Sequence, residues 1–215
     1  DRLEPEVLSS LLNSYLNEMA KIALKYGGTI DKFVGDAILI FFGDPETNGE
    51  KADATSCVLM ALEMRERMKF MRQIWEDEGI SKPLNIRIGI NTGYCNVGNF
   101  GSEDRLDYTI IGGEVNLASR LESNASVGQI LVSHETYSLI KNSINCEERE
   151  EINVKGLAHK VRTYQVIDKK EKTEKGVAKL KDNYDGFSLS IDLDVSRKAE
   201  VIASLKNALA KIQKN

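Results

Sequence analysis

Apolar and polar residues alternate along the chain with two different periods. In residues 3–25 the apolar positions recur three and four apart, which predicts an amphipathic helix ending at Gly27 and Gly28. The same criteria predict further elements: helices over residues 50–75, 114–123, 135–141 and 197–212, and strands over 29–34, 37–42, 84–97, 130–133, 162–167 and 186–194. Helices interleaved with a mixed sheet indicate an α+β fold, an α/β sandwich in its layers.

The charge pattern divides this series of elements. A run of lysines and glutamates begins at residue 169 and indicates a solvated linker over residues 169–183. We therefore expect one main domain over residues 1–168 and a small β-α tail over residues 184–215. The tail could pack on the main domain, belong to a further module or mediate oligomerisation.

Composition narrows the class of protein. The 215 residues are 41% hydrophobic and 29% charged, which is typical of a soluble domain, and the net charge of −4 provides no general basic field for nucleic acid. The longest apolar run is too short to cross a bilayer, and the N-terminus lacks a signal-peptide layout. Three widely spaced cysteines favour a reduced, cytoplasmic setting without a zinc site.

Candidate chemistry is concentrated where two strands meet. Gly35 and Asp36 alone separate strand-like residues 29–34 from the apolar run 37–42, as a two-residue hairpin turn requires. The turn would present Asp36 at one end of the sheet, with Lys32 on the preceding strand. In isolation, Asp36 would be interpreted as an ordinary turn residue.

Two motifs resemble those of the class III nucleotidyl cyclases. The first is the Gly-Asp turn just described. The second is the run from Tyr108 to Glu122, which reads YTIIGGEVNLASRLE. Together with Val154-Lys155-Gly156, the resemblance covers about residues 1–168 and implies the ferredoxin-like catalytic domain of that family.

The resemblance implies a metal site. Asp36 would be one of two carboxylates that hold two divalent ions, Mg²⁺ or Mn²⁺, in each active site. In the family the other aspartate lies on an earlier strand, and Asp1-Arg-Leu-Glu-Pro-Glu6 resembles the segment just after that strand, so we expect an N-terminally truncated chain. Asp31 is a poor substitute, because we expect Lys32 next to it on the opposite face of the strand.

By resemblance, Lys32 occupies a position that contacts the purine, and hydrogen-bond polarity then indicates which base it suits. The ammonium of Lys32 only donates, so it suits N1 of adenine, which accepts, rather than N1 of guanine, which carries a proton. Thr109 occupies the second purine-contacting position by resemblance, and its hydroxyl can accept from the adenine amino group. In isolation, Lys32 would be a solvated lysine and Thr109 a strand former.

Three further residues receive roles from the resemblance. Asn116 and Arg120 are four apart on one predicted helix and therefore share a face. Asn116 would orient the ribose, and Arg120 would stabilise charge developing on the transferred phosphoryl group. Lys155 would contact the triphosphate.

The leading hypothesis is an adenylate cyclase that converts ATP to 3′,5′-cyclic AMP. Because class III sites combine residues from two domains, it predicts a head-to-tail homodimer, and a regulatory domain or membrane tether outside the chain is compatible with it. Guanylate cyclase is the nearest alternative, and a non-catalytic dimerisation or nucleotide-sensing module is the second. A diguanylate cyclase is disfavoured because no Gly-Gly-Asp/Glu-Glu-Phe signature occurs.

Overall fold

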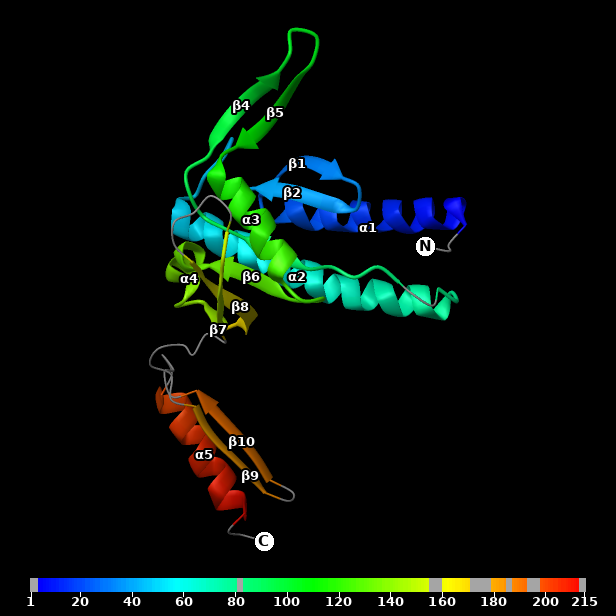
Figure 1. Cartoon of the computed structure of the whole chain (residues 1–215). Coiled ribbons are helices and arrows are strands. Elements are labelled where there is room, and N and C mark those ends of the chain that lie inside the picture. The colour runs from blue at the N-terminus through cyan, green and yellow to red at the C-terminus, as the bar shows by residue number, and fades with distance from the viewer. Residues whose placement is uncertain are drawn as a thin grey trace. The chain divides into compact units, whose positions relative to one another are not determined.

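A computed structural model describes residues 4–80, 83–154, 160–170, 179–184, 187–192 and 198–212. The chain divides into two units, Asp1–Lys170 and Glu171–Asn215 (Figure 1). In chain order, the elements of the first unit are α1 (Pro5–Lys25), β1 (Thr29–Val34), β2 (Ala37–Phe41), α2 (Glu50–Asp77), β3 (Ile88–Ile90), β4 (Asn96–Gly101), β5 (Leu106–Ile111), α3 (Gly113–Asn124), β6 (Ile130–Ser133), α4 (His134–Ile140), β7 (Ile144–Ile152) and β8 (Val161–Lys169).

The strands of the first unit form one four-stranded sheet and two hairpins. The sheet has the order β3-β6-β8-β7, in which β3 and β6 are parallel and the other neighbours are antiparallel. The hairpins are β1-β2 and β4-β5. The observed mixture of helices and a mixed sheet confirms the predicted α+β class.

Helix α2 separates two apolar clusters. One face of α2 packs with the sheet, where Val58, Ile130 and Val166 are fully buried. Its methionines and Trp75 pack instead with Leu11 and Met19 of α1. Helix α1 and the β1-β2 hairpin that follows it are therefore held against the other side of α2.

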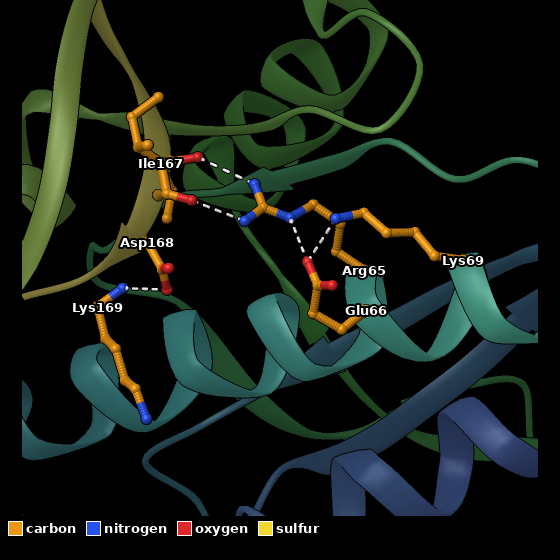
Figure 2. Close-up of polar contacts among 7 residues, drawn as sticks. Arg65, Glu66, Lys69, Ile167, Asp168 and Lys169 are labelled. Atoms are coloured by element: carbon orange, nitrogen blue, oxygen red, sulfur yellow. Dashed lines mark hydrogen bonds and ion pairs between the residues drawn. The ribbon is translucent and has the colours of Figure 1, made fainter. Parts of the chain in front are cut away.

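Arg65 ties α2 to β8, an interior strand of the sheet, near the C-terminal end of that strand (Figure 2). Its guanidinium donates to the backbone oxygens of Val166 at 3.2 Å and Ile167 at 2.7 Å, both on β8. Glu66 lies 3.7 Å from the same guanidinium and 2.7 Å from the ammonium of Lys69. These hydrogen bonds are directional. They therefore fix the orientation of α2 on the sheet, in addition to the apolar contacts between the two.

Helix α3 lies directly on β3 because Gly89 has no side chain. A Cβ atom at Gly89 would lie 2.2 Å from the backbone nitrogen of Glu122 and 2.3 Å from the backbone oxygen of Ala118. Leu121 of the same helix is fully buried. The spacing between helix and strand is thus set by backbone atoms that cannot rotate out of the way.

Several predicted elements differ from those observed. The strand expected over residues 84–97 is two strands, β3 and β4, because residues 91–95 interrupt the pairing. Strand β7 was not predicted, since it is an edge strand whose exposed charged residues hide the two-residue period. Strand β5 was likewise not predicted, although the second motif begins on it.

The second unit has one more strand than predicted. It consists of β9 (Lys179–Tyr184), β10 (Phe187–Asp192) and α5 (Lys198–Ile212), with β9 and β10 antiparallel. Strand β9 lies largely within residues 169–183, which the run of charged residues had predicted to be a linker. In neither unit does a described helix have both the length and the apolar character needed to span a membrane.

Candidate functional site

Asp36 lies at the tip of the β1-β2 hairpin, as the turn predicted. Val34 pairs with Ala37, and Gly35 has a φ of +63°, which glycine adopts without strain. Asp36 is exposed, and its carboxylate has no hydrogen bond or ion pair with any other residue of the described part. The turn therefore supplies a free carboxylate.

A cleft of about 1810 Å³ begins beside this turn and continues between β2 and β3. Its lining includes Asp36, the length of β2 and β3, and the first turns of α3 with Asn116. Among the described strands β2 pairs only with β1, and β3 only with β6. Two strand edges thus border the cleft with unpaired backbone groups.

The negative charge of Asp36 affects the pKa of Tyr15 on α1. This buried side chain also lines the cleft, and burial followed by the negative charge of Asp36 raises the pKa of its phenol to about 12.

Lys32 and Thr109 meet at a third residue, Asp31. Thr109 Oγ1 donates to Asp31 Oδ2 at 2.8 Å, and the Lys32 ammonium lies 3.6 Å from the same oxygen. The Asp31 side chain is 1% exposed, whereas that of Lys32 is 46% exposed. The structure therefore brings together the two residues predicted to contact the purine.

The strict alternation expected at Asp31 and Lys32 is interrupted in the structure. The register of β1 against β2 shifts between Ile30 and Lys32, so Asp31 is the extra residue of a β-bulge. A bulge breaks the strict alternation of a strand and re-aims a side chain. Asp31 consequently turns inward to Thr109 on β5 and stays within reach of Lys32.

Asn116 and Arg120 are exposed on α3, one turn apart. Neither side chain has a hydrogen bond or ion pair with another residue among those that the structure describes. Asn116 lines the cleft with Asp36, whereas Arg120, Lys32 and Thr109 are not part of its lining. Lys155 lies outside the described residues.

Asn91 and Glu114 also line the cleft, and the sequence patterns did not single them out. Asn91 follows β3 and donates through Nδ2 to Glu114 Oε2 at 2.7 Å and to the Glu114 backbone oxygen at 3.1 Å. Gly93 permits this approach, since a Cβ there would lie 2.6 Å from Glu114 Cγ. Burial and the charge of Glu114 also raise the pKa of the Cys95 thiol. The pair fixes the first turn of α3, which carries Asn116. The signal in the sequence that could have indicated this contact was the Asn91-Thr-Gly93 break after β3.

The metal predicted from the resemblance fits Asp36 in donor chemistry. Mg²⁺ prefers oxygen ligands and is often held by one or two carboxylates together with substrate phosphates. A free carboxylate bordering a large cleft matches that requirement. Within the described ranges, no group of three or more His, Cys, Asp or Glu side chains is placed so that it could bind a metal ion by itself.

Comparison with known proteins identifies the family. Residues 1–168 match the family described as "Adenylate and Guanylate cyclase catalytic domain". The chain belongs to this family. The prediction of a class III cyclase catalytic domain is confirmed.

Solved structures of the cyclase family have the same fold. The domain is 63% identical to the adenylyl cyclase CyaB from P. aeruginosa, with a TM-score of 0.76, over 78% of this chain and 85% of that one. It is 36% identical to the guanylyl cyclase Cya2, with a TM-score of 0.74, over 80% of this chain and 85% of that one.

Curated relatives of the cyclase domain are longer proteins. The adenylate cyclase described as terminal-differentiation specific in Dictyostelium discoideum is 35% identical over 79% of this chain, which corresponds to 8% of that relative. Across eight such relatives the chain spans between 8% and 37% of their lengths.

Proposed function

We propose that the protein is an adenylate cyclase that converts ATP to 3′,5′-cyclic AMP and pyrophosphate. The observation that carries the proposal is the pairing of Lys32 and Thr109 on the Asp31 carboxylate. An ammonium opposite N1 and a hydroxyl oxygen opposite the exocyclic amino group match adenine in both positions. The 63% identity to an enzyme described as an adenylyl cyclase supports the same substrate.

The reaction needs positioning and charge stabilisation more than covalent help from the protein. The 3′-hydroxyl oxygen attacks the α-phosphorus, the bond from that phosphorus to the bridging oxygen breaks, and the hydroxyl proton is released with pyrophosphate as the leaving group. Asn116 holds the ribose so that the hydroxyl lies in line with the leaving oxygen. Arg120, a permanent cation with a fork of donors, stabilises the charge that builds up on the transferred group.

Asp36 holds divalent metal in this proposal. When bound, two Mg²⁺ or Mn²⁺ ions would supply Lewis-acid stabilisation for the phosphoryl transfer. Asp36 provides one carboxylate, and we propose that a strand seated between β2 and β3 provides the other. The cleft and its two unpaired strand edges support this, because an added strand would satisfy the backbone groups on both sides.

The active site is shared in a head-to-tail homodimer. Asp36 lines the cleft, whereas Lys32 and Thr109 form a separate cluster and Arg120 projects from α3 without a partner in the described part. Phe33 and Val34 beside the turn are exposed apolar residues, as are Leu106 and Ile111 on β5. A second copy of the chain that covers these residues would bury apolar area and complete two equivalent active sites in the dimer.

Mixing two inactive variants tests the shared site. We expect Asp36→Asn and Arg120→Ala each to lower turnover about 100-fold or more as homodimers. Each mixed dimer retains one intact site of two, so an equimolar mixture in which half of the dimers are mixed recovers about a quarter of wild-type activity. Unrestored activity, with mixed dimers demonstrated by a tag on one variant, contradicts the shared site.

The substrate is tested by incubating the full-length protein with ATP or GTP and Mn²⁺ and identifying the products by chromatography with mass detection. Cyclic AMP from ATP alone supports the proposal. Cyclic GMP makes the protein a guanylate cyclase, the alternative favoured by the 36% identity to Cya2. Absence of product from a folded dimer that binds ATP moves the assignment to a nucleotide-sensing module. Cytoplasmic location stays a prediction.

A further inference from the structure

Asp31 is a buried carboxylate whose hydrogen bonding is incomplete. Its side chain is 1% exposed, and Oδ2 accepts from Thr109 Oγ1 at 2.8 Å. Oδ1 is buried without a hydrogen-bond partner among the described residues. A buried carboxylate oxygen without a hydrogen-bond donor lowers the stability of the fold. If stability alone determined the residue at position 31, a less polar side chain would be expected there.

The hydrogen bond to Asp31 determines what the Thr109 hydroxyl can do. A threonine hydroxyl has one hydrogen and two lone pairs. Because that hydrogen is donated to Asp31, the oxygen can only accept from a ligand. Thr109 is itself 6% exposed, so water competes little for the hydroxyl.

We propose that Asp31 is a positioning residue that selects adenine by fixing the Thr109 hydroxyl as an acceptor. This inference rests on the proposed function, because it assumes that Lys32 and Thr109 contact the base. The exocyclic group at position 6 of adenine is an amine that donates, whereas that of guanine is an oxygen that accepts. An acceptor held at this point pairs with adenine and leaves guanine O6 opposed by a lone pair.

The bulge at Asp31 is what makes this arrangement possible. A regular strand would direct the side chains of residues 31 and 32 to opposite faces, and only one of them could reach the base region. The register shift lets Asp31 point to Thr109 while its carboxylate stays 3.6 Å from the Lys32 ammonium. One carboxylate thus orients both polar groups that read the purine.

The test replaces the carboxylate by an amide of the same shape. In Asp31→Asn the side-chain NH₂ can donate to Thr109 Oγ1, which frees the hydroxyl hydrogen to point at the ligand. We expect the preference for ATP over GTP in kcat/KM to fall about 10-fold or more, as is typical when a hydrogen bond in a desolvated site is mismatched.

A second substrate isolates the contact at position 6. Purine riboside triphosphate has the N1 acceptor of ATP but lacks the amino group, so the ratio of kcat/KM for ATP to that for this analogue does not report on Lys32. We expect wild-type protein to favour ATP about 3- to 10-fold. Both Asp31→Asn and Thr109→Val should bring the ratio close to 1, and Asp31→Asn should have no further effect when added to Thr109→Val.

Two controls separate positioning from structure. Asp107→Asn changes an exposed aspartate on β5 that lies 3.7 Å from Arg105, and it should leave both ratios unchanged. The melting temperature of Asp31→Asn should equal or exceed that of wild type, because an amide costs less to bury than a carboxylate. A drop in melting temperature with unchanged ratios makes Asp31 purely structural and overturns the inference.

Binding measurements distinguish the inference from the proposed function. The dissociation constants of 3′-deoxy-ATP and 3′-deoxy-GTP, which lack the attacking hydroxyl, report base preference without turnover. If wild-type protein prefers 3′-deoxy-ATP but forms no cyclic AMP, the proposed function fails while the inference is judged on the binding ratio. If Asp31→Asn retains the wild-type ratios in both binding and turnover, the inference fails while the cyclase activity stands.

Discussion

Gly89→Ala is the sharpest test of how the fold positions the site. The added methyl carbon would lie 2.2 Å from the Glu122 nitrogen and 2.3 Å from the Ala118 oxygen, whereas ordinary contact begins near 3.4 Å. Both atoms belong to the backbone of α3, so no side-chain rotation relieves the overlap. The helix must move away from β3 by about 1 Å, the scale of displacement that disables positioned groups.

Two consequences of this displacement can be measured. Overpacking of a buried contact costs about 1–3 kcal/mol, which lowers the melting temperature by roughly 2–12 °C for a unit of this size. Because α3 carries Asn116 and Arg120, we also expect kcat to fall about 100-fold. Thermal unfolding followed by circular dichroism and initial-rate assays under saturating ATP and Mn²⁺ measure the two effects.

Gly113→Ala is the matched control on the same helix. A Cβ atom at Gly113 meets nothing within 4 Å, and alanine in a helix is more favourable than glycine by about 0.5–1 kcal/mol. This variant should be at least as stable as wild type and retain its activity. If Gly89→Ala matches it in both measurements, the close contact between α3 and β3 does not exist in solution.

Variants at three other residues test single side chains. Arg120→Ala should lower kcat about 100- to 1000-fold with little change in KM, and Arg120→Lys should not restore it, because a lysine cannot reproduce the planar fork of donors; a change confined to KM would contradict this role. Lys32→Glu should lower the ATP-to-GTP ratio of kcat/KM, and an unchanged ratio would remove Lys32 from base recognition. Glu63 accepts from Lys25 and Tyr26, which holds its pKa below the ordinary value of 4.5, so its stabilisation is present above that pH and is lost as pH falls through the lowered pKa. Glu63→Gln should therefore cost about 0.5 kcal/mol in urea unfolding at pH 7 and less at a pH below the lowered pKa of Glu63, and an equal cost at both pH values would contradict the ionic origin.

Local patterns predicted the elements that bury one regular face. The periodic apolar residues of α1 and the Gly35-Asp36 turn between β1 and β2 were found because propensity, period and turn chemistry agree there. Strand β7 was missed because it lies at the edge of the sheet and most of its side chains are charged and exposed. Its sequence therefore has no apolar period.

The sequence named candidate residues for the site but not how they are arranged. Lys32 and Thr109 were assigned to the base through a resemblance, yet nothing in the sequence indicated that Asp31 joins them. A β-bulge depends on how two strands register, which is a property of the pair rather than of either segment. The bond from Asn91 to Glu114 was missed for the same reason, since its partners are 23 positions apart.

The edges of β2 and β3 that no described strand pairs have a practical consequence for handling the protein. A strand edge with free N–H and C=O groups is a template on which another chain can pair, and β2 is almost wholly apolar. Preparations in which no strand occupies the cleft should aggregate through intermolecular sheet formation, with thioflavin T fluorescence rising as protein concentration increases. The choice of expression boundaries would then determine solubility as much as activity.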